Sequence, residues 1–247
     1  MKAYKIEDTR MLKDNVTEEQ LSALLKEYIE LYPEVVDEDI VDHIETFLSL
    51  GLQCDQAPCY VMQFYDEYNL MKDEYNLYKG FIELIKHNHP DLSNMTILDV
   101  GGGIVPSLGR RLAEEAKHVI TMDRFITTKN NPNNLEAITC EIEDEKQLPS
   151  ADLIVGFMPC EATRFIVEHA AKNNTDFLIE LCGCIHDENM RYQLMMYPYM
   201  EYRLRREYET QLNDYIKSKI KEYNLGLYSE YGCSMNMPYK VLGNKRV

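Results

Sequence analysis

Three consecutive glycines between two acidic residues form a pattern that can bind a nucleoside. The acids stand two residues before the glycines and at the end of the next apolar run, and the residues concerned are Asp99, Gly101, Gly102, Gly103 and Asp123. Glycine lets a ligand approach bare backbone, and the amino end of a following helix offers N–H groups that have no partner. An acid at the end of the next strand can accept hydrogen bonds from the two hydroxyls of a ribose. The spacing therefore predicts a nucleoside-binding site.

A second group of reactive side chains follows two later apolar runs. Cys160 and Glu161 come after the run that ends at Phe157, and His186 follows the run that ends at Cys182. Thiol, carboxylate and imidazole groups act as nucleophiles, general bases and general acids. These three are the candidate catalytic residues, and Glu161 or His186 is the nearest base if the acceptor of a reaction arrives protonated.

The same two segments hold enough cysteine for a zinc site to be considered. Three thiolates and an imidazole suit zinc, and here they would come from Cys160, Cys182, Cys184 and His186. A Cys-x-Cys-x-His spacing at a strand end is not usual for zinc, so we predict no metal site. The alternatives are that one of these residues contacts a substrate, or that they are small buried residues beside an ordinary histidine.

Short apolar runs alternate with helical spacing from residue 91 onward. Expected strands cover 96–100, 118–123, 135–140, 152–157 and 176–182, and a strand pair follows at 226–231 and 237–242. Helical spacing covers 107–116, 162–170 and a long stretch from 199, whereas 124–134 is short or irregular. The alternation predicts an α/β fold with a doubly wound, mainly parallel seven-stranded sheet that ends in an antiparallel hairpin.

The first 90 residues have helical spacing throughout. The sequence from Thr17 to Gln20 is a capping box before a helix that Pro33 interrupts, and apolar periodicity returns over 36–48 and 58–85. We therefore predict two units, a helical N-terminal domain over 1–90 and a ligand-binding domain over 91–247. The helices would cover the opening of the sheet or form the surface of a homodimer. Tyrosines of this unit either pack between helices or line the cleft, namely Tyr60, Tyr65, Tyr68 and Tyr75.

Charge and composition disfavour some classes of function. The net charge of −16 argues against a broad surface for nucleic acid or an anionic membrane, although Arg203 to Arg206 could form a local patch. The sequence shows no signal-peptide core, and no run approaches the roughly 20 apolar residues of a membrane span. Seven cysteines fit reduced thiols better than a disulfide framework, so we expect a cytoplasmic protein.

The glycine spacing and the strand order resemble those of class I S-adenosylmethionine (SAM) methyltransferases. The dinucleotide motif Gly-x-Gly-x-x-Gly would place its third glycine at Pro106, which removes the packing glycine of an NAD site. The opening motif of the methyltransferases, Asp/Glu-x-Gly-x-Gly-x-Gly, instead fits Asp99 to Gly103 and departs at Val105. A closing hairpin is also a trait of this family, and the resemblance covers about residues 91–247. It implies SAM as the cofactor.

The resemblance also implies a role for each residue of the site. Asp123 would hold the ribose hydroxyls, and Glu141, or else Glu143 or Asp144, would meet the adenine amino group. The glycine loop would pass under the methionine part, whose amino group Asp99 would help to orient. The implied cofactor-binding set is Asp99, Gly101, Gly102, Gly103, Asp123, Arg124, Glu141, Ile142 and Phe157.

The expected activity is methyl transfer from SAM to a small-molecule acceptor. Such a displacement needs alignment and exclusion of water more than a dedicated side chain. Three alternatives stay open. One is aminocarboxypropyl transfer as in enzymes similar to nicotianamine synthase, and a second is a tRNA methyltransferase, to which Cys160 with Ala162 and Thr163 is faintly similar. The third is a regulatory protein that binds SAM without turnover.

Overall fold

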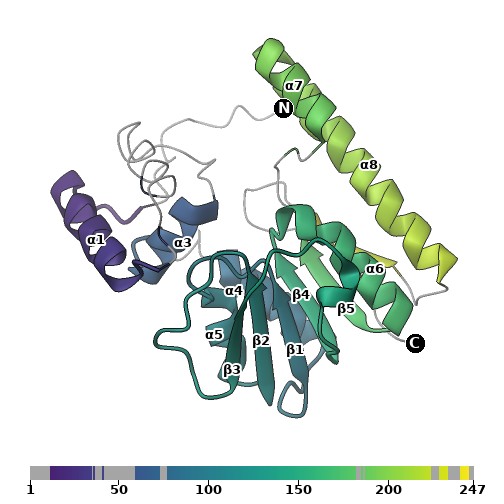
Figure 1. Ribbon diagram of the computed structural model, residues 1–247, viewed down its shortest axis with the longest axis horizontal. Helices are drawn as coiled ribbons and strands as arrows, with labels where there is room; N and C mark the ends of the chain where they lie inside the picture. Colours follow the sequence, from purple (N-terminus) through teal and green to yellow (C-terminus); the bar gives the residue numbers. More distant parts are fainter. Residues whose placement is uncertain are drawn as a thin grey trace.

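A sheet of seven strands forms the centre of the described structure (Figure 1). The computed structural model describes residues 12–34, 36, 41, 59–72, 77–181, 185, 187–223, 228–232 and 240–244. The strands follow the order β3-β2-β1-β4-β5-β7-β6. Their bounds are β1 Thr96–Val100, β2 His118–Asp123, β3 Leu135–Thr139, β4 Leu153–Phe157, β5 Asp176–Glu180, β6 Tyr228–Gly232 and β7 Lys240–Asn244.

Strands β1 to β5 are parallel, and β7 runs antiparallel to both of its neighbours, β5 and β6. The chain builds outward from β1 through β2 to β3, then returns to the other side of β1 for β4 and β5. The strand order therefore reverses between β1 and β4, and ligands of such sheets bind at the carboxyl ends of the strands at that point. The predicted α/β fold with a mainly parallel sheet is confirmed.

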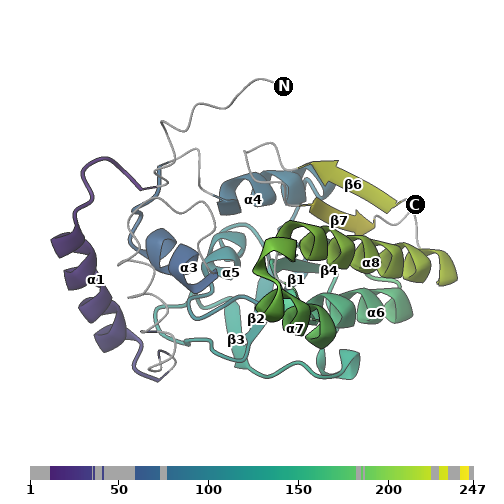
Figure 2. The same ribbon diagram turned by 90° about the horizontal axis from the view of Figure 1, so that it is seen from above.

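Helices cover both faces of the sheet (Figure 2). One face packs against α4 (Leu77–Asn88) and α5 (Ser107–Ala113), and the other against α6 (Thr163–Asn173), α7 (Glu188–Met196) and α8 (Glu201–Glu222). Side chains alternate along β1, so that Ile97 packs toward α5 while Leu98 and Val100 pack toward α8. Short 3₁₀ turns complete the described elements at Glu145–Gln147, Cys160–Ala162 and Pro198–Met200.

The first predicted helix is confirmed as α1 (Glu18–Leu31), and Thr17 caps it by accepting a hydrogen bond from the N–H of Gln20. Beyond residue 58 the chain forms two helices, α3 (Cys59–Glu67) and α4. The expectation that the first 90 residues are helical throughout is wrong. Asn69 adopts a left-handed conformation that ends α3, and Met71 then pairs with Leu12 in an antiparallel bridge. Most of the expected helix over 36–48 lies outside the described residues.

Helix α7 was not predicted from the sequence, whereas the irregular connection after β2 was. Asp187 caps α7 by accepting the N–H of Met190, although the helix has little apolar periodicity to predict it. The segment 124–134 contains no helix, as predicted. In the described part of the chain, no helix combines the length and the apolar composition needed to cross a bilayer.

Candidate functional site

The glycine loop turns sharply over the carboxyl ends of β2 and β4. Gly101 and Gly103 have φ values of +79° and +75°, and residues that carry a Cβ atom rarely adopt such values. The N–H groups of Gly101 and Gly102 both point to the carbonyl oxygen of Met122, at 2.8 and 3.3 Å. A Cβ on Gly101 would lie 2.8 Å from the Cα atom of Pro159. Close packing against Pro159 therefore requires glycine at position 101.

Asp123 is tied directly to this loop. Its Oδ2 atom accepts a 2.9 Å hydrogen bond from the N–H of Gly103, and its Oδ1 atom accepts one of 3.0 Å from the N–H of Phe125. Burial raises the pKa of Asp123, although these backbone donors oppose the shift. Each carboxylate oxygen has a second lone pair, so Asp123 retains acceptor capacity for a diol.

Asp99 lies beneath the glycine loop rather than on an open surface. It is 1% exposed, and its Oδ2 atom accepts a hydrogen bond of 3.3 Å from the hydroxyl of Thr121. Its Oδ1 atom has no hydrogen-bond partner among the described residues. Burial raises the pKa of Asp99 to about 7. A buried carboxylate oxygen without a partner is placed to receive a donor from a ligand, because such atoms are rarely left unsatisfied.

Gly109 of α5 is a residue of the site that the sequence analysis missed. A Cβ at this position would overlap the hydroxyl of Thr121 and come within 3.4 Å of Oδ2 of Asp99. Gly109 therefore allows close helix-to-strand packing three residues after Pro106, the position at which the dinucleotide motif would have its third glycine. An isolated glycine inside a helical pattern was the available signal.

Gln63 of α3 covers the last glycine of the loop. Its Oε1 atom accepts a 3.1 Å hydrogen bond from the N–H of Ile104, and a Cβ on Gly103 would overlap its amide group. Gln63 is 7% exposed, so this amide is part of the interior. Ile104 and Val105 also join the apolar cluster that α1 and α3 form. The glycine loop is thus buried from the side of the N-terminal helices.

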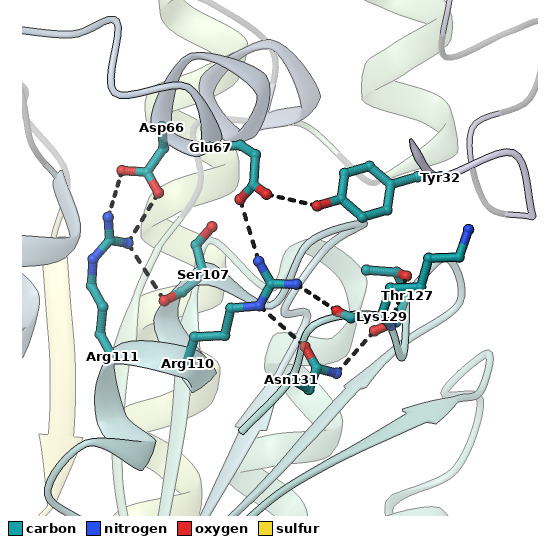
Figure 3. A network of polar contacts seen from close by, with 9 residues as sticks. All are labelled: Tyr32, Asp66, Glu67, Ser107, Arg110, Arg111, Thr127, Lys129 and Asn131. Carbon is teal, nitrogen blue, oxygen red and sulfur yellow. Dashed lines mark hydrogen bonds and ion pairs between the residues drawn. The ribbon is translucent and has the colours of Figure 1, made fainter. Parts of the chain in front are cut away.

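Two guanidinium groups hold α3 above α5 (Figure 3). Arg111 makes hydrogen bonds of 3.0 and 2.9 Å to both carboxylate oxygens of Asp66. Arg110 lies 3.4 Å from Glu67, which also accepts a 2.6 Å hydrogen bond from the hydroxyl of Tyr32. Burial raises the pKa of Tyr32 to about 12, and the hydrogen bond to Glu67 adds to the shift. The pairs connect α3 to the helix that follows the glycine loop.

The residues predicted to meet the adenine lie in a loop after β3. Glu141 is exposed, Ile142 is half-buried, and Gln147 fixes the loop by donating to the carbonyl oxygen of Glu141 at 3.2 Å. The Asp144 carboxylate accepts the N–H of Lys146 and so caps the next turn. Asp144 therefore has a structural partner, whereas the Glu141 carboxylate projects to solvent. Arg124 is also exposed, and its guanidinium stacks 4.9 Å from the ring centre of Phe125.

Two of the three predicted catalytic residues, Cys160 and Glu161, lie in the described turn after β4. The ring of Phe157 packs against Tyr78 and Phe81 of α4, with centres 4.7 and 5.5 Å apart. Met158 and Cys160 both have positive φ, which for residues other than glycine is strained and concentrates at functional loops. Glu161 is exposed on the same turn. His186, Cys182 and Cys184 lie outside the described residues, so their distance from Cys160 is untested.

Two of the four predicted tyrosines pack inside the N-terminal unit. Tyr65 and Tyr68 belong to the apolar cluster around Phe64, whose ring centre lies 5.9 and 5.4 Å from theirs. The side chains of Tyr60 and Tyr75 lie outside the described residues. Within the described ranges, no three of the histidine, cysteine and acidic side chains are grouped as a metal site would need.

Glu180, the last residue of β5, is a further buried carboxylate that the sequence analysis did not single out. It pairs in register with Phe157 and is 1% exposed. Its Oε1 atom has no hydrogen-bond partner among the described residues, and burial raises its pKa to about 7. A charged residue at a strand end resembles an ordinary solvated position in the sequence, which is why no pattern drew attention to it.

Comparisons with known proteins give distant likenesses. No protein-family model matches this chain, and no curated protein matches it. Among solved structures, magnesium protoporphyrin IX methyltransferase from Synechocystis PCC 6803, with bound SAH, has a TM-score of 0.49 at 11% identity, covering 87% of this chain and 97% of its own. A putative S-adenosyl-L-methionine-dependent methyltransferase from Methanococcus maripaludis has a TM-score of 0.47 at 14% identity, covering 76% and 92%. Both are proteins to which this chain is similar.

Proposed function

We propose that this protein is a SAM-dependent methyltransferase that acts on a small-molecule acceptor. The observation that carries the proposal is the hydrogen bond from the glycine loop to the acid of the next strand, Gly103 to Asp123. It brings the glycine turn after β1 and the acid that ends β2 together at the carboxyl ends of these parallel strands, where such sheets bind ligands.

The residues present fit the cofactor. The orphaned Oδ1 atom of Asp99 suits the amino group of the methionine part, Asp123 suits the ribose, and Glu141 with the backbone of Ile142 suits the adenine. When bound, SAM supplies an electrophilic methyl group on a sulfonium.

The far end of the sheet favours SAM over a nicotinamide dinucleotide. In the strand order of dinucleotide-binding sheets, the sixth strand follows the fifth in the same direction. Here the neighbour of β5 is β7, which runs antiparallel and pairs with β6. This closing pair is the trait in which the sequence resembles class I methyltransferases, and it supports the same cofactor as the glycine spacing.

The N-terminal helices support a small acceptor. Gln63 and the pairs from Asp66 and Glu67 place α3 against the glycine loop and α5, so α1 and α3 would form a helical cap beside the site. A capped site encloses a small molecule more readily than a macromolecule. The net charge of −16 also disfavours a nucleic-acid acceptor. We keep Cys160, Glu161 and His186 as residues beside the acceptor.

Calorimetry tests the cofactor assignment. We expect SAM to bind the wild type and NAD not to bind. Asp123→Ala should weaken SAM binding at least 10-fold, because the ribose loses its acceptor. Asp123→Asn, which can keep one loop hydrogen bond, separates loss of the loop from loss of the carboxylate. Glu207→Ala, at an exposed acid on α8, is the control and should change binding less than 2-fold. NAD binding, or SAM binding unchanged by Asp123→Ala, would overturn the assignment.

Product analysis tests the reaction. Methyl transfer releases S-adenosylhomocysteine, whereas aminocarboxypropyl transfer releases methylthioadenosine. Tight SAM binding without either product in the presence of acceptors would favour the regulatory alternative. Methylthioadenosine as the main product would contradict the proposed methyl transfer while leaving the cofactor assignment intact.

A further inference from the structure

The nucleoside site leaves one buried carboxylate at the same end of the sheet unexplained. Glu180 is 1% exposed, and Oε1 lacks a hydrogen-bond partner among the described residues. Burying a polar atom without a partner opposes folding, so a chain that retains one has a use for it. Asp99 has the same properties and is explained by the cofactor. Glu180 belongs to β5, two strands from β1, and it is not among the residues expected to hold the cofactor.

The register places Glu180 next to Phe157 on the face covered by α4. Phe157 pairs with Glu180, and two residues earlier Val155 pairs with Leu178. Leu178 packs in the cluster of α4 and α5, so strand alternation puts Glu180 on that face as well. The ring of Phe157 contacts Tyr78 and Phe81 there. The register thus puts the Glu180 side chain next to that of Phe157 at the carboxyl ends of β4 and β5, the edge to which the glycine loop belongs.

On the basis of the methyl transfer proposed above, we propose that Glu180 binds the acceptor and that the acceptor is a small amine. A buried carboxylate is stable as an anion only with a cation beside it, and an ammonium group supplies that charge. Aromatic ring faces also attract ammonium groups. The near-complete burial of Glu180 limits the partner to a small molecule that can be enclosed with it. Burial raises the pKa of Glu180 to about 7, which suits a group that exchanges a proton near neutrality.

Glu180 also solves the chemical problem that an ammonium acceptor poses. An ammonium nitrogen has no lone pair, so it cannot accept a methyl group until it loses a proton. An N–H bond breaks, the proton passes to a carboxylate oxygen of Glu180, and the electron pair of that bond stays on nitrogen. The neutral amine then takes the methyl group that SAM supplies, and nitrogen gains the positive charge that sulfur loses.

The experiment uses the full-length protein, methyl-labelled SAM and matched acceptor probes. The probes are 2-phenylethylamine, benzylamine and butylamine, each paired with the alcohol of the same skeleton. Label transfer and thermal stabilisation by each probe are measured for the wild type, Glu180→Gln and Glu207→Gln. Glu207 is an exposed acid on α8 and serves as the control. SAM binding is measured by calorimetry for all three proteins.

We expect the wild type to bind and methylate amines but not their alcohols. Glu180→Gln should fold and bind SAM within 2-fold of the wild type. Amines should no longer raise its unfolding temperature, and its kcat/KM for amines should fall at least 100-fold. Glu207→Gln should match the wild type. Three outcomes would overturn the inference while SAM binding leaves the proposed function standing. They are methyl transfer to the alcohols, no binding or methylation of any amine, and full activity of Glu180→Gln. Loss of SAM binding by the wild type would instead remove the proposed function.

Discussion

The amide group of Gln63 occupies the space in which a side chain on Gly103 would have to lie. Gly103 also has a φ of +75°, so two separate constraints require glycine at this position. The first is steric and depends on Gln63, whereas the second belongs to the backbone of the loop. A pair of substitutions can separate them.

We predict that Gly103→Ala destabilises the fold by about 2–4 kcal/mol, because left-handed strain of about 1–2 kcal/mol adds to the overlap with Gln63. Adding Gln63→Ala to Gly103→Ala should remove the share of the destabilisation that comes from overlap with the Gln63 amide. The share that comes from left-handed backbone strain should stay. Urea denaturation of both single variants and the double variant measures the coupling. Additive effects would mean that the amide does not restrict residue 103.

Gly109 and Gly80 are glycines inside helices with opposite surroundings. A Cβ on Gly109 would overlap the hydroxyl of Thr121, whereas a Cβ on Gly80 would meet nothing within 4 Å. Alanine favours a helix over glycine by about 0.8–1.0 kcal/mol, so Gly80→Ala should raise the free energy of unfolding. Gly109→Ala should lower it by about 1–3 kcal/mol and weaken SAM binding, because Asp99 lies in the same contact. Equal effects of the two substitutions on thermal unfolding would refute this difference.

The pair between Arg111 and Asp66 should hold α3 more strongly than an ordinary surface ion pair. The Asp66 side chain is 5% exposed and makes two hydrogen bonds to one guanidinium. Arg111 is about one-third exposed, so water screens part of the interaction, and we expect Asp66→Asn to cost about 1–3 kcal/mol. The pair of Lys72 with Asp14, in which the Asp14 side chain is exposed, is the control, and Asp14→Asn should cost less than about 1 kcal/mol.

Hydrogen exchange at the N–H of Ile104 reports on the docking of α3, because Gln63 accepts that hydrogen bond. Asp66→Asn should speed this exchange, and Asp14→Asn should leave it unchanged. Protection of Ile104 that survives the loss of Asp66 would show that packing of the apolar cluster alone holds α3 in place.

Local patterns predicted the glycine loop and Asp123, because strand, turn and helix are adjacent in the sequence there. Thr17 as a helix cap follows from the same kind of local chemistry. Gln63 reaches the loop from 41 residues away, so its role depends on how α3 packs, and no short-range pattern encodes that. Glu180 could not be predicted from the sequence, because only its burial distinguishes it from other acids at strand ends. That burial depends on the neighbouring strands and helices. At Asn69 the sequence pattern was misleading, because helical apolar spacing continues beyond this residue although α3 ends there.

The unusual burial of Glu180 should be visible in the pH dependence of stability. The pKa of Glu180 rises from an ordinary value of 4.5 to about 7 in the folded state. Between these two pH values the folded state holds a proton that the unfolded state has released. The free energy of unfolding should therefore fall as the pH rises from about 4.5 to 7, by up to about 3 kcal/mol from this group.

Glu180→Gln has no proton to lose, so it should remove this part of the slope. We expect the difference in unfolding free energy between the variant and the wild type to grow in favour of the variant across pH 4.5 to 7 and to stay constant above pH 8. Urea denaturation at closely spaced pH values measures it, and Glu207→Gln on the exposed face of α8 is the control. Parallel curves for wild type and Glu180→Gln would mean that the carboxylate ionises in the folded protein as it does in water. Glu180 would then lack the buried character that makes it a partner for an ammonium group.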